Sequence, residues 1–167
     1  MKNPLLAAIR ENTEVMFANA EIMLRTCDPE YLLCGMPVWR HLYHTFHSCD
    51  RWYINPCVYE EPAFHAENLN SLDLPCEKVL SMEELAAYLA AVREKILAYL
   101  DGLTDERLTE IPEGCSQNRL GLILSQIRHF YAHIGYVNAT TIIERNEWPR
   151  VVGVGDRLAL SDEELYE

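Results

Sequence analysis

The sequence predicts an all-α fold, a four-helix bundle with a long crossover connection between helices 2 and 3. Two observations support this prediction. Apolar residues recur at three- and four-residue spacing in four long segments, and no segment of useful length alternates as a half-buried strand would. A proline-containing stretch at 55–80 lacks this periodicity and separates the second segment from the third. Periodicity alone also fits a globin-like packing, but four helices and one crossover are typical of a bundle.

The first two helices are bounded by prolines. The first is expected at about 5–27 and should stop before Pro29, because the residue that precedes a proline disfavours the α conformation. The second is expected to begin at Pro37, since proline is tolerated at the first helical position, and to end before Pro56. This second helix carries three of the six histidines.

The third helix has the clearest boundaries, at 81–101. Ser81 can cap the free amide of Glu84 while the Glu84 side chain reaches back to the Ser81 amide, which is a capping box. Gly102 stands at the C′ position, where a glycine commonly ends a helix.

The last long helix is expected from Ser116 or Asn118 to Arg145, because an apolar stripe at helical spacing runs through it. A chain of 167 residues is of the size of one domain. We therefore assign residues 1–150 to a single bundle and residues 151–167 to an acidic tail that packs on the bundle or extends from it.

Charge and hydropathy narrow the class of protein. Acidic residues number 26 and basic residues 14, so the net charge is −12 at pH 7, which disfavours binding to nucleic acid or to an anionic membrane. No apolar stretch approaches the roughly 20 residues of a membrane span, and charges follow the N-terminus too closely for a secretory signal. The six cysteines are scattered singly. We expect a cytoplasmic protein with reduced thiols, no nucleic acid partner and no membrane partner.

Two histidines of the last helix have the spacing of metal ligands. His129 and His133 are four residues apart, so about 400° of rotation and roughly 6 Å of rise place both rings on one face. A helix offers two nitrogens to one metal ion at this spacing. In a chain with six histidines the pair alone is a modest signal, and surface or hydrogen-bonded histidines are the alternative.

A second group of histidines strengthens the case for a metal. His41, His44 and His47 lie on the second expected helix, and bundle metal sites are built from facing helices. Three neutral imidazoles on a divalent ion leave one coordination position open. The helical wheel leaves the third ligand undecided, because His47 lies nearer to the apolar stripe whereas His44 lies on a polar side.

Two segments carry a resemblance to a known family. WRHLYHTFHSCDRW at 39–52 and HFYAHIG at 129–135 resemble the DinB-like superfamily of four-helix metal-binding proteins. In that family one histidine of the second helix and an HxxxH pair of the last helix bind a divalent metal. The first segment is also similar to the HxxHT element of ergothioneine-biosynthesis relatives, whose ligand is the histidine before threonine. The resemblance therefore implies His44, His129 and His133 as the metal ligands.

The resemblance implies a metal site more firmly than a reaction. Members include thiol-dependent transferases and isomerases, so we expect a metal-dependent hydrolase or thiol-dependent transferase that acts on a small-molecule substrate. The expected cofactors are a divalent transition metal (Zn, Ni, Mn or Fe) and, for a transferase, a low-molecular-weight thiol. Asp50, His47 and Tyr136 are the nearest candidates for orienting ligands or moving protons. The alternative is a non-catalytic metal-binding or purely structural bundle that forms a homodimer.

Overall fold

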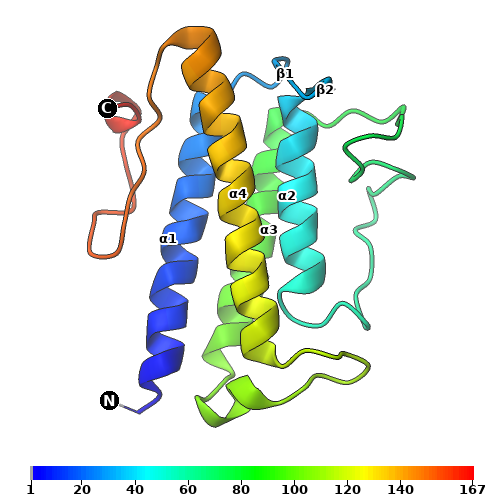
Figure 1. Cartoon of the computed structure of the whole chain (residues 1–167), viewed down its shortest axis with the longest axis vertical. Coiled ribbons are helices and arrows are strands. Elements are labelled where there is room, and N and C mark those ends of the chain that lie inside the picture. The colour runs from blue at the N-terminus through cyan, green and yellow to red at the C-terminus, as the bar shows by residue number, and fades with distance from the viewer. Residues whose placement is uncertain (1) are drawn as a thin grey trace.

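The computed structural model describes residues 2–167 and shows four long helices that lie side by side (Figure 1). A short hairpin with two residues in each strand precedes α2, and two short 3-10 helices lie outside the bundle. The elements are α1 (Pro4–Thr26), β1 (Leu32–Leu33), β2 (Met36–Pro37), α2 (Val38–Trp52), α3 (Met82–Asp101), η1 (Glu106–Thr109), α4 (Arg119–Arg145) and η2 (Asp162–Glu164). The predicted all-α four-helix bundle is confirmed, and the crossover at 53–81 runs along the outside of α2 (Figure 1).

Side-chain caps set the starts of the third and fourth helices. The Ser81 hydroxyl accepts a hydrogen bond from the Glu84 amide at 3.2 Å, and the Glu84 carboxylate accepts one from the Ser81 amide at 2.8 Å. The predicted capping box is therefore confirmed. Asn118 caps α4 by accepting from the amide of Gly121 at 2.8 Å. Gly102 ends α3, as predicted, with a φ of −87°.

The bounds of α2 differ from the prediction at both ends. Pro37 is not the first helical residue: its backbone is extended, with ψ 146°, because it pairs with Leu32 in the hairpin. The helix therefore begins at Val38. It ends at Trp52 rather than just before Pro56. A hairpin with two residues in each strand is too short to show an alternating pattern in the sequence.

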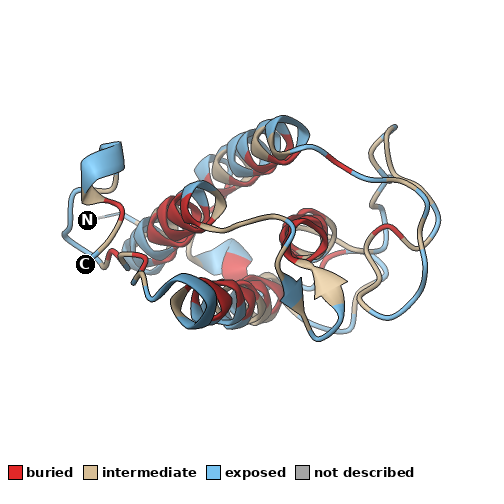
Figure 2. Ribbon diagram, turned by 90° about the horizontal axis from the view of Figure 1, so that it is seen from above, coloured by how far each residue is buried: buried red, intermediate tan, exposed pale blue. Residues whose placement is uncertain are grey.

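The core lies between the facing surfaces of the four helices, where the buried residues gather (Figure 2). Phe130 of α4 stacks on Phe46 of α2 and meets Phe17 of α1 edge-on, with 6.0 Å between ring centroids in both pairs. All three rings are fully buried. This aromatic contact fixes the face of α4 that turns toward α2, and with it the direction in which the α4 histidines point.

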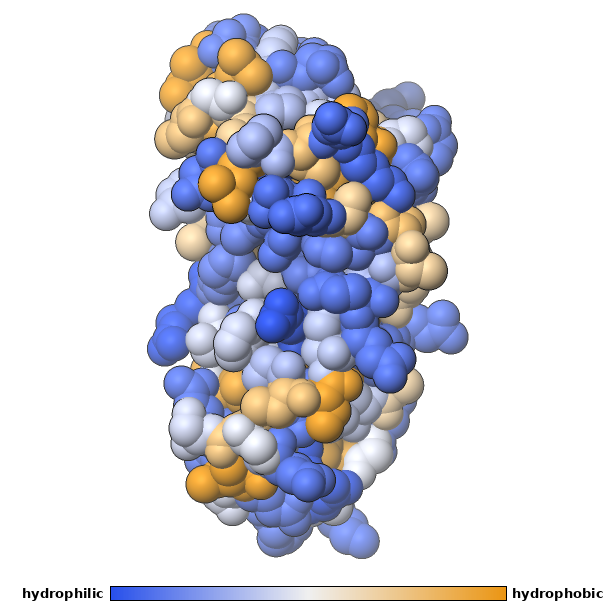
Figure 3. Space-filling view, turned by 90° about the vertical axis from the view of Figure 1, so that its right-hand side faces the viewer, coloured by the Kyte–Doolittle hydropathy of each residue, from blue (hydrophilic) through white to orange (hydrophobic). Residues whose placement is uncertain are grey.

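A buried arginine holds the crossover against α2. The Arg40 side chain is almost fully buried, and its Nη2 atom donates to the carbonyl oxygens of Asn68 at 2.6 Å and Leu74 at 2.5 Å. Leu69 between them is fully buried in the core. The surface on this side of the molecule is mostly hydrophilic, with separate apolar areas (Figure 3). The crossover is thus a packed segment with a polar outer surface.

The residues after α4 return along α1 (Figure 1). Asn19 of α1 donates to the Val152 carbonyl at 2.9 Å and accepts from the Val152 amide at 3.0 Å. Val152 and Leu165 pack on Ala18 and Ile22 in a small apolar cluster. The division of the chain at residue 150 stays a prediction. In residues 2–167 no helix combines the length and the apolar character that a bilayer span needs.

Candidate metal centre

Three of the predicted site histidines meet between α2 and α4. The ring centroid of His44 lies 5.4 Å from that of His129 and 4.8 Å from that of His133, and the centroids of the two α4 rings are 4.6 Å apart. One ring nitrogen from each residue lies within 4.8 Å of the other two. His133 is buried, and the other two are partly exposed. The fold therefore brings the two α4 histidines together with His44.

The spacing of the nitrogen atoms suits a metal ion. The Nε2 atoms of His129 and His133 are 3.2 Å apart. Two nitrogens at the zinc–nitrogen distance of about 2.0–2.1 Å in a tetrahedral site are roughly 3.3–3.4 Å apart. The same separation is that of a hydrogen bond in which one neutral imidazole donates to the other. The pair can thus exchange a shared proton for a shared ion with little movement.

The crossover orients the third imidazole. Nδ1 of His44 lies 2.7 Å from the carbonyl oxygen of Asn70, so the protonated Nδ1 donates and Nε2 is left as the free nitrogen. Metal-binding histidines almost always have such an acceptor on the nitrogen that does not bind. Nδ1 of His129 and of His133 is buried and has no hydrogen-bond partner in the part of the chain that the structure describes.

Burial keeps the α4 imidazoles neutral. Desolvation, with the nearby rings of His129 and His44 as smaller causes, lowers the pKa of His133 from its ordinary value to about 3. Desolvation also lowers the pKa of His129, and the His44 ring adds to the effect. Because imidazole must be neutral to bind a metal ion, both residues are ready to do so at neutral pH without first losing a proton.

The other two histidines of α2 have different partners. Nε2 of His41 is 2.9 Å from the Leu33 carbonyl oxygen in the hairpin, and its ring centroid is 6.4 Å from that of His133. His47 makes a 2.6 Å contact between Nε2 and the Glu61 carboxylate, in a separate cluster. Of the three histidines on α2, the structure thus places His44 in the cluster with the α4 pair.

Asp50 and Tyr136, the other two candidates for orienting ligands or moving protons, differ in whether they contact the three histidines. The Asp50 carboxylate accepts hydrogen bonds from the hydroxyls of Tyr59 at 3.1 Å and Tyr88 at 2.9 Å, and from Lys95 Nζ at 2.6 Å. Its partners thus belong to α3 and the crossover. Tyr136 is exposed, and its ring meets that of His133 edge-on at 5.6 Å. Of these two candidates, Tyr136 is the one in contact with the histidine cluster.

A cavity of about 370 Å³ is lined by residues of α2, α4 and two loops, and the three histidines are not among its lining residues. Its lining includes Ser48, one turn after His44, and Gln126, about one turn before His129. The side-chain oxygens of these two residues are 3.3 Å apart. Loop residues around Cys57 and Cys115 complete its wall. Sequence reasoning missed this cavity because two irregular segments, distant in the chain, form half of its lining.

The fold and the cluster together define a four-helix bundle with three imidazoles placed between its second and fourth long helices, an arrangement that fits the binding of a divalent metal ion. Residues 18–137 match the family model of the DinB superfamily. The chain therefore belongs to the DinB superfamily, as its two histidine segments predict. No curated protein and no solved structure gives a significant match to the chain.

Proposed function

We propose that the protein binds one divalent transition-metal ion through His44, His129 and His133 and uses it to act on a small molecule. The supporting observation is the meeting of three imidazoles from two helices, with one nitrogen of each within 4.8 Å of the other two. Three protein ligands are typical of catalytic zinc sites, which keep a position for water or substrate. When bound, such an ion supplies Lewis acidity, which polarises a substrate oxygen or lowers the pKa of a thiol.

The chain's own residues have distinct parts in this proposal. Asn70 orients the His44 ring, and burial keeps His133 neutral. Ser48 and Gln126 border the cavity with a hydroxyl and an amide, which can hold polar groups of a substrate. The Tyr136 hydroxyl is the exposed polar group on the ring that contacts His133. Metal-dependent hydrolysis and transfer of a low-molecular-weight thiol are the two reactions that we propose for this site.

The ligand assignment is tested by metal binding to untagged protein. We expect the chelator-treated chain to bind Zn²⁺, Ni²⁺, Mn²⁺ or Fe²⁺ when each is added alone, with affinities measured by calorimetry and contents by elemental analysis. Imidazole donors suit several of these ions, so the comparison identifies the preferred one. His133→Ala and His129→Ala should each lose the ion. His41→Gln is the matched control, because it changes a buried histidine of α2 outside the cluster.

An unchanged metal content in His133→Ala would remove the ligand assignment. Activity is then tested with the preferred ion, by transfer of glutathione or bacillithiol to small electrophiles and by hydrolysis of small esters and amides. Turnover that depends on the ion and is lost in His133→Ala supports the enzyme. Stabilisation by the ion without turnover favours the non-catalytic alternative, and light scattering shows whether that bundle is a homodimer.

A further inference from the structure

A second group of metal-ligand side chains lies on the crossover side of α2. His47 of α2 meets Glu61 and His65 of the crossover, and one donor atom from each lies within 4.8 Å of the other two. Glu61 Oε2 is 2.6 Å from His47 Nε2 and 3.8 Å from His65 Nδ1. His47 is 2% exposed and His65 17%, whereas Glu61 is 41% exposed. The cluster thus has a buried base and an opening to solvent through Glu61.

The two imidazoles have the spacing of rings that share an ion. The ring centroids of His47 and His65 are 5.0 Å apart, with the rings 18° from parallel. Two imidazoles bound to one tetrahedral zinc at about 2.0–2.1 Å have centroids roughly 5 Å apart. The separation also falls between the 4.6 Å and 5.4 Å found among the three histidines of the first cluster. The separation of the rings is compatible with a shared ion, and the 2.6 Å contact between His47 Nε2 and Glu61 Oε2 must open to admit it.

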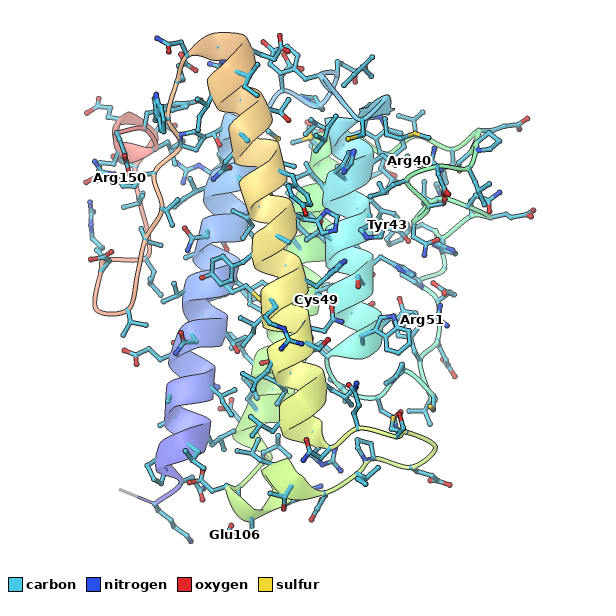
Figure 4. The ribbon with its side chains drawn as sticks, viewed as in Figure 1. Arg40, Tyr43, Cys49, Arg51, Glu106 and Arg150 are labelled. Atoms are coloured by element: carbon cyan, nitrogen blue, oxygen red, sulfur yellow. The ribbon has the colours of Figure 1, made fainter. Side chains whose placement is uncertain are left out.

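Neighbouring side chains hold the donors in place. The hydroxyl of Tyr43, a fully buried residue, is 2.7 Å from Nδ1 of His65, so His65 binds an ion through Nε2, or through Nδ1 only when the ion replaces this hydrogen bond. Arg51 Nη1 is 3.5 Å from Glu61 Oε1, which leaves Oε2 directed at the histidines. Tyr43 and Arg51 both lie on the side of α2 that faces the crossover (Figure 4). His47 is one helical turn from each of them.

We propose that His47, Glu61 and His65 form a second divalent-metal site, separate from the three-histidine cluster. Two histidines and a glutamate are a donor set of catalytic zinc sites, and two histidines with one carboxylate also hold non-haem Fe²⁺. The Glu61 carboxylate supplies a negative charge that the three-histidine cluster lacks. This carboxylate oxygen donor suits Mn²⁺ and Fe²⁺ in addition to Zn²⁺.

The second site connects two parts of the fold. His47 belongs to α2 whereas Glu61 and His65 belong to the crossover, so an ion shared among them ties the crossover to the helix. Asn70, whose carbonyl orients His44, lies five residues beyond His65 in the same segment. An ion at the second site therefore stabilises the segment that positions the first cluster. Metal binding at the second site does not itself depend on the function proposed for the first.

The experiment uses the full chain with the first cluster disabled by His129→Ala and His133→Ala together. We expect this double variant to bind one Zn²⁺ or Co²⁺ ion, measured by calorimetry and by the absorption of bound Co²⁺. Adding Glu61→Gln should weaken binding by at least about 100-fold, because loss of a partner outside the ligand set alone costs about 10–100-fold. Glu60→Gln is the matched control, since it removes the same charge from the exposed neighbouring residue.

His65→Gln provides a second test at a partly exposed position, and circular dichroism and a thermal melt establish that each variant is folded. The proposal is overturned if the folded double variant takes up no Zn²⁺ or Co²⁺, or if Glu61→Gln and His65→Gln bind as tightly as Glu60→Gln. The two sites remain distinguishable. If only the three-histidine cluster binds metal, His133→Ala loses all metal binding. If only the site of His47, Glu61 and His65 binds metal, His133→Ala keeps it.

Discussion

The Nε2 atoms of His129 and His133 lie 3.2 Å apart on one face of α4, where His133 is buried and His129 is partly exposed. Two protonated imidazoles cannot occupy this position, because each would place its positive charge against the other in a poorly solvated site. The arrangement is therefore compatible with two neutral rings or with a bound metal ion, and we expect acid to drive the two rings apart.

Acid should destabilise the metal-free protein. A histidine in the unfolded chain has a pKa of about 6.5, whereas burial lowers the pKa of His133 to about 3. Between these values the unfolded chain binds more protons than the folded one, so the free energy of unfolding rises with pH and falls on acidification. Burial also lowers the pKa of His41, His47 and His129, which adds to the effect in the same direction.

Urea denaturation in chelator at several pH values from 7 to 4 measures this loss. His133→Leu should reduce the slope of stability against pH by up to about 1.4 kcal/mol per pH unit. A free energy of unfolding that stays constant from pH 7 to pH 4 would contradict the neutral state of these rings.

Tyr88→Phe should destabilise the bundle by about 1.5–3 kcal/mol, because it removes a hydrogen bond to the buried Asp50 carboxylate. Burial, with Asp50 as a further cause, raises the pKa of Tyr88, so its hydroxyl stays a donor at any working pH. Tyr59→Phe is the matched control: it removes a longer bond to the same oxygen at a more exposed position and should cost less. Chemical denaturation compares the free energies of unfolding of the two variants. Equal losses would show that the Tyr88 hydrogen bond contributes no more stability than the Tyr59 one.

Asn19→Ala should release the C-terminal segment from α1. The substitution leaves the amide and the carbonyl of Val152 without their partner, at a cost of about 1–3 kcal/mol for each buried group. We expect limited proteolysis to cut within 151–167 before it cuts the helices. Asn12→Ala is the control, because the Asn12 side chain is exposed and bonds only within its own helix. Identical digestion of both variants would show that the segment is held by other contacts.

The cysteines should react with an alkylating agent in the order of their exposure. Cys34 and Cys57 are exposed, whereas Cys49 is fully buried and its pKa is raised by that burial. The thiolate is the reactive form, so Cys49 should remain unmodified until the protein unfolds. Burial likewise raises the pKa of Cys27, to about 12. Mass spectrometry of timed samples gives the order, and modification of Cys49 as fast as Cys57 would show that the core opens readily.

Local chemistry explains which helix ends could be predicted. The capping box at Ser81 and the cap at Asn118 are made by side chains within three residues of the amides that they satisfy, so the sequence contains both partners. Pro37 was predicted wrongly because its conformation depends on pairing with Leu32 in a hairpin. Gly102 ends α3 as predicted, because a glycine after the last turn is itself a local signal in the sequence.

The helical period alone places His129 and His133 on one face, because residues four apart always lie on one side of a helix. It does not decide their partner on α2, where His44 and His47 lie on adjoining sides. The resemblance to the DinB superfamily indicates His44, and the tertiary structure brings that ring to the α4 pair. Glu61 and His65 were not singled out, since they lie on an irregular segment with no periodicity to mark them.

By itself the sequence determined the elements of this protein: four long helices, the capping box of the third, the membership of the DinB superfamily and a pair of histidines set by the 3.6-residue turn. These properties depend on residues near one another in the chain. Only the tertiary structure decided which faces meet, because the aromatic contact of Phe46 with Phe130 and the crossover held by Arg40 join residues far apart in sequence. That packing gathers five of the six histidines into two clusters, one between α2 and α4 and one beneath the crossover.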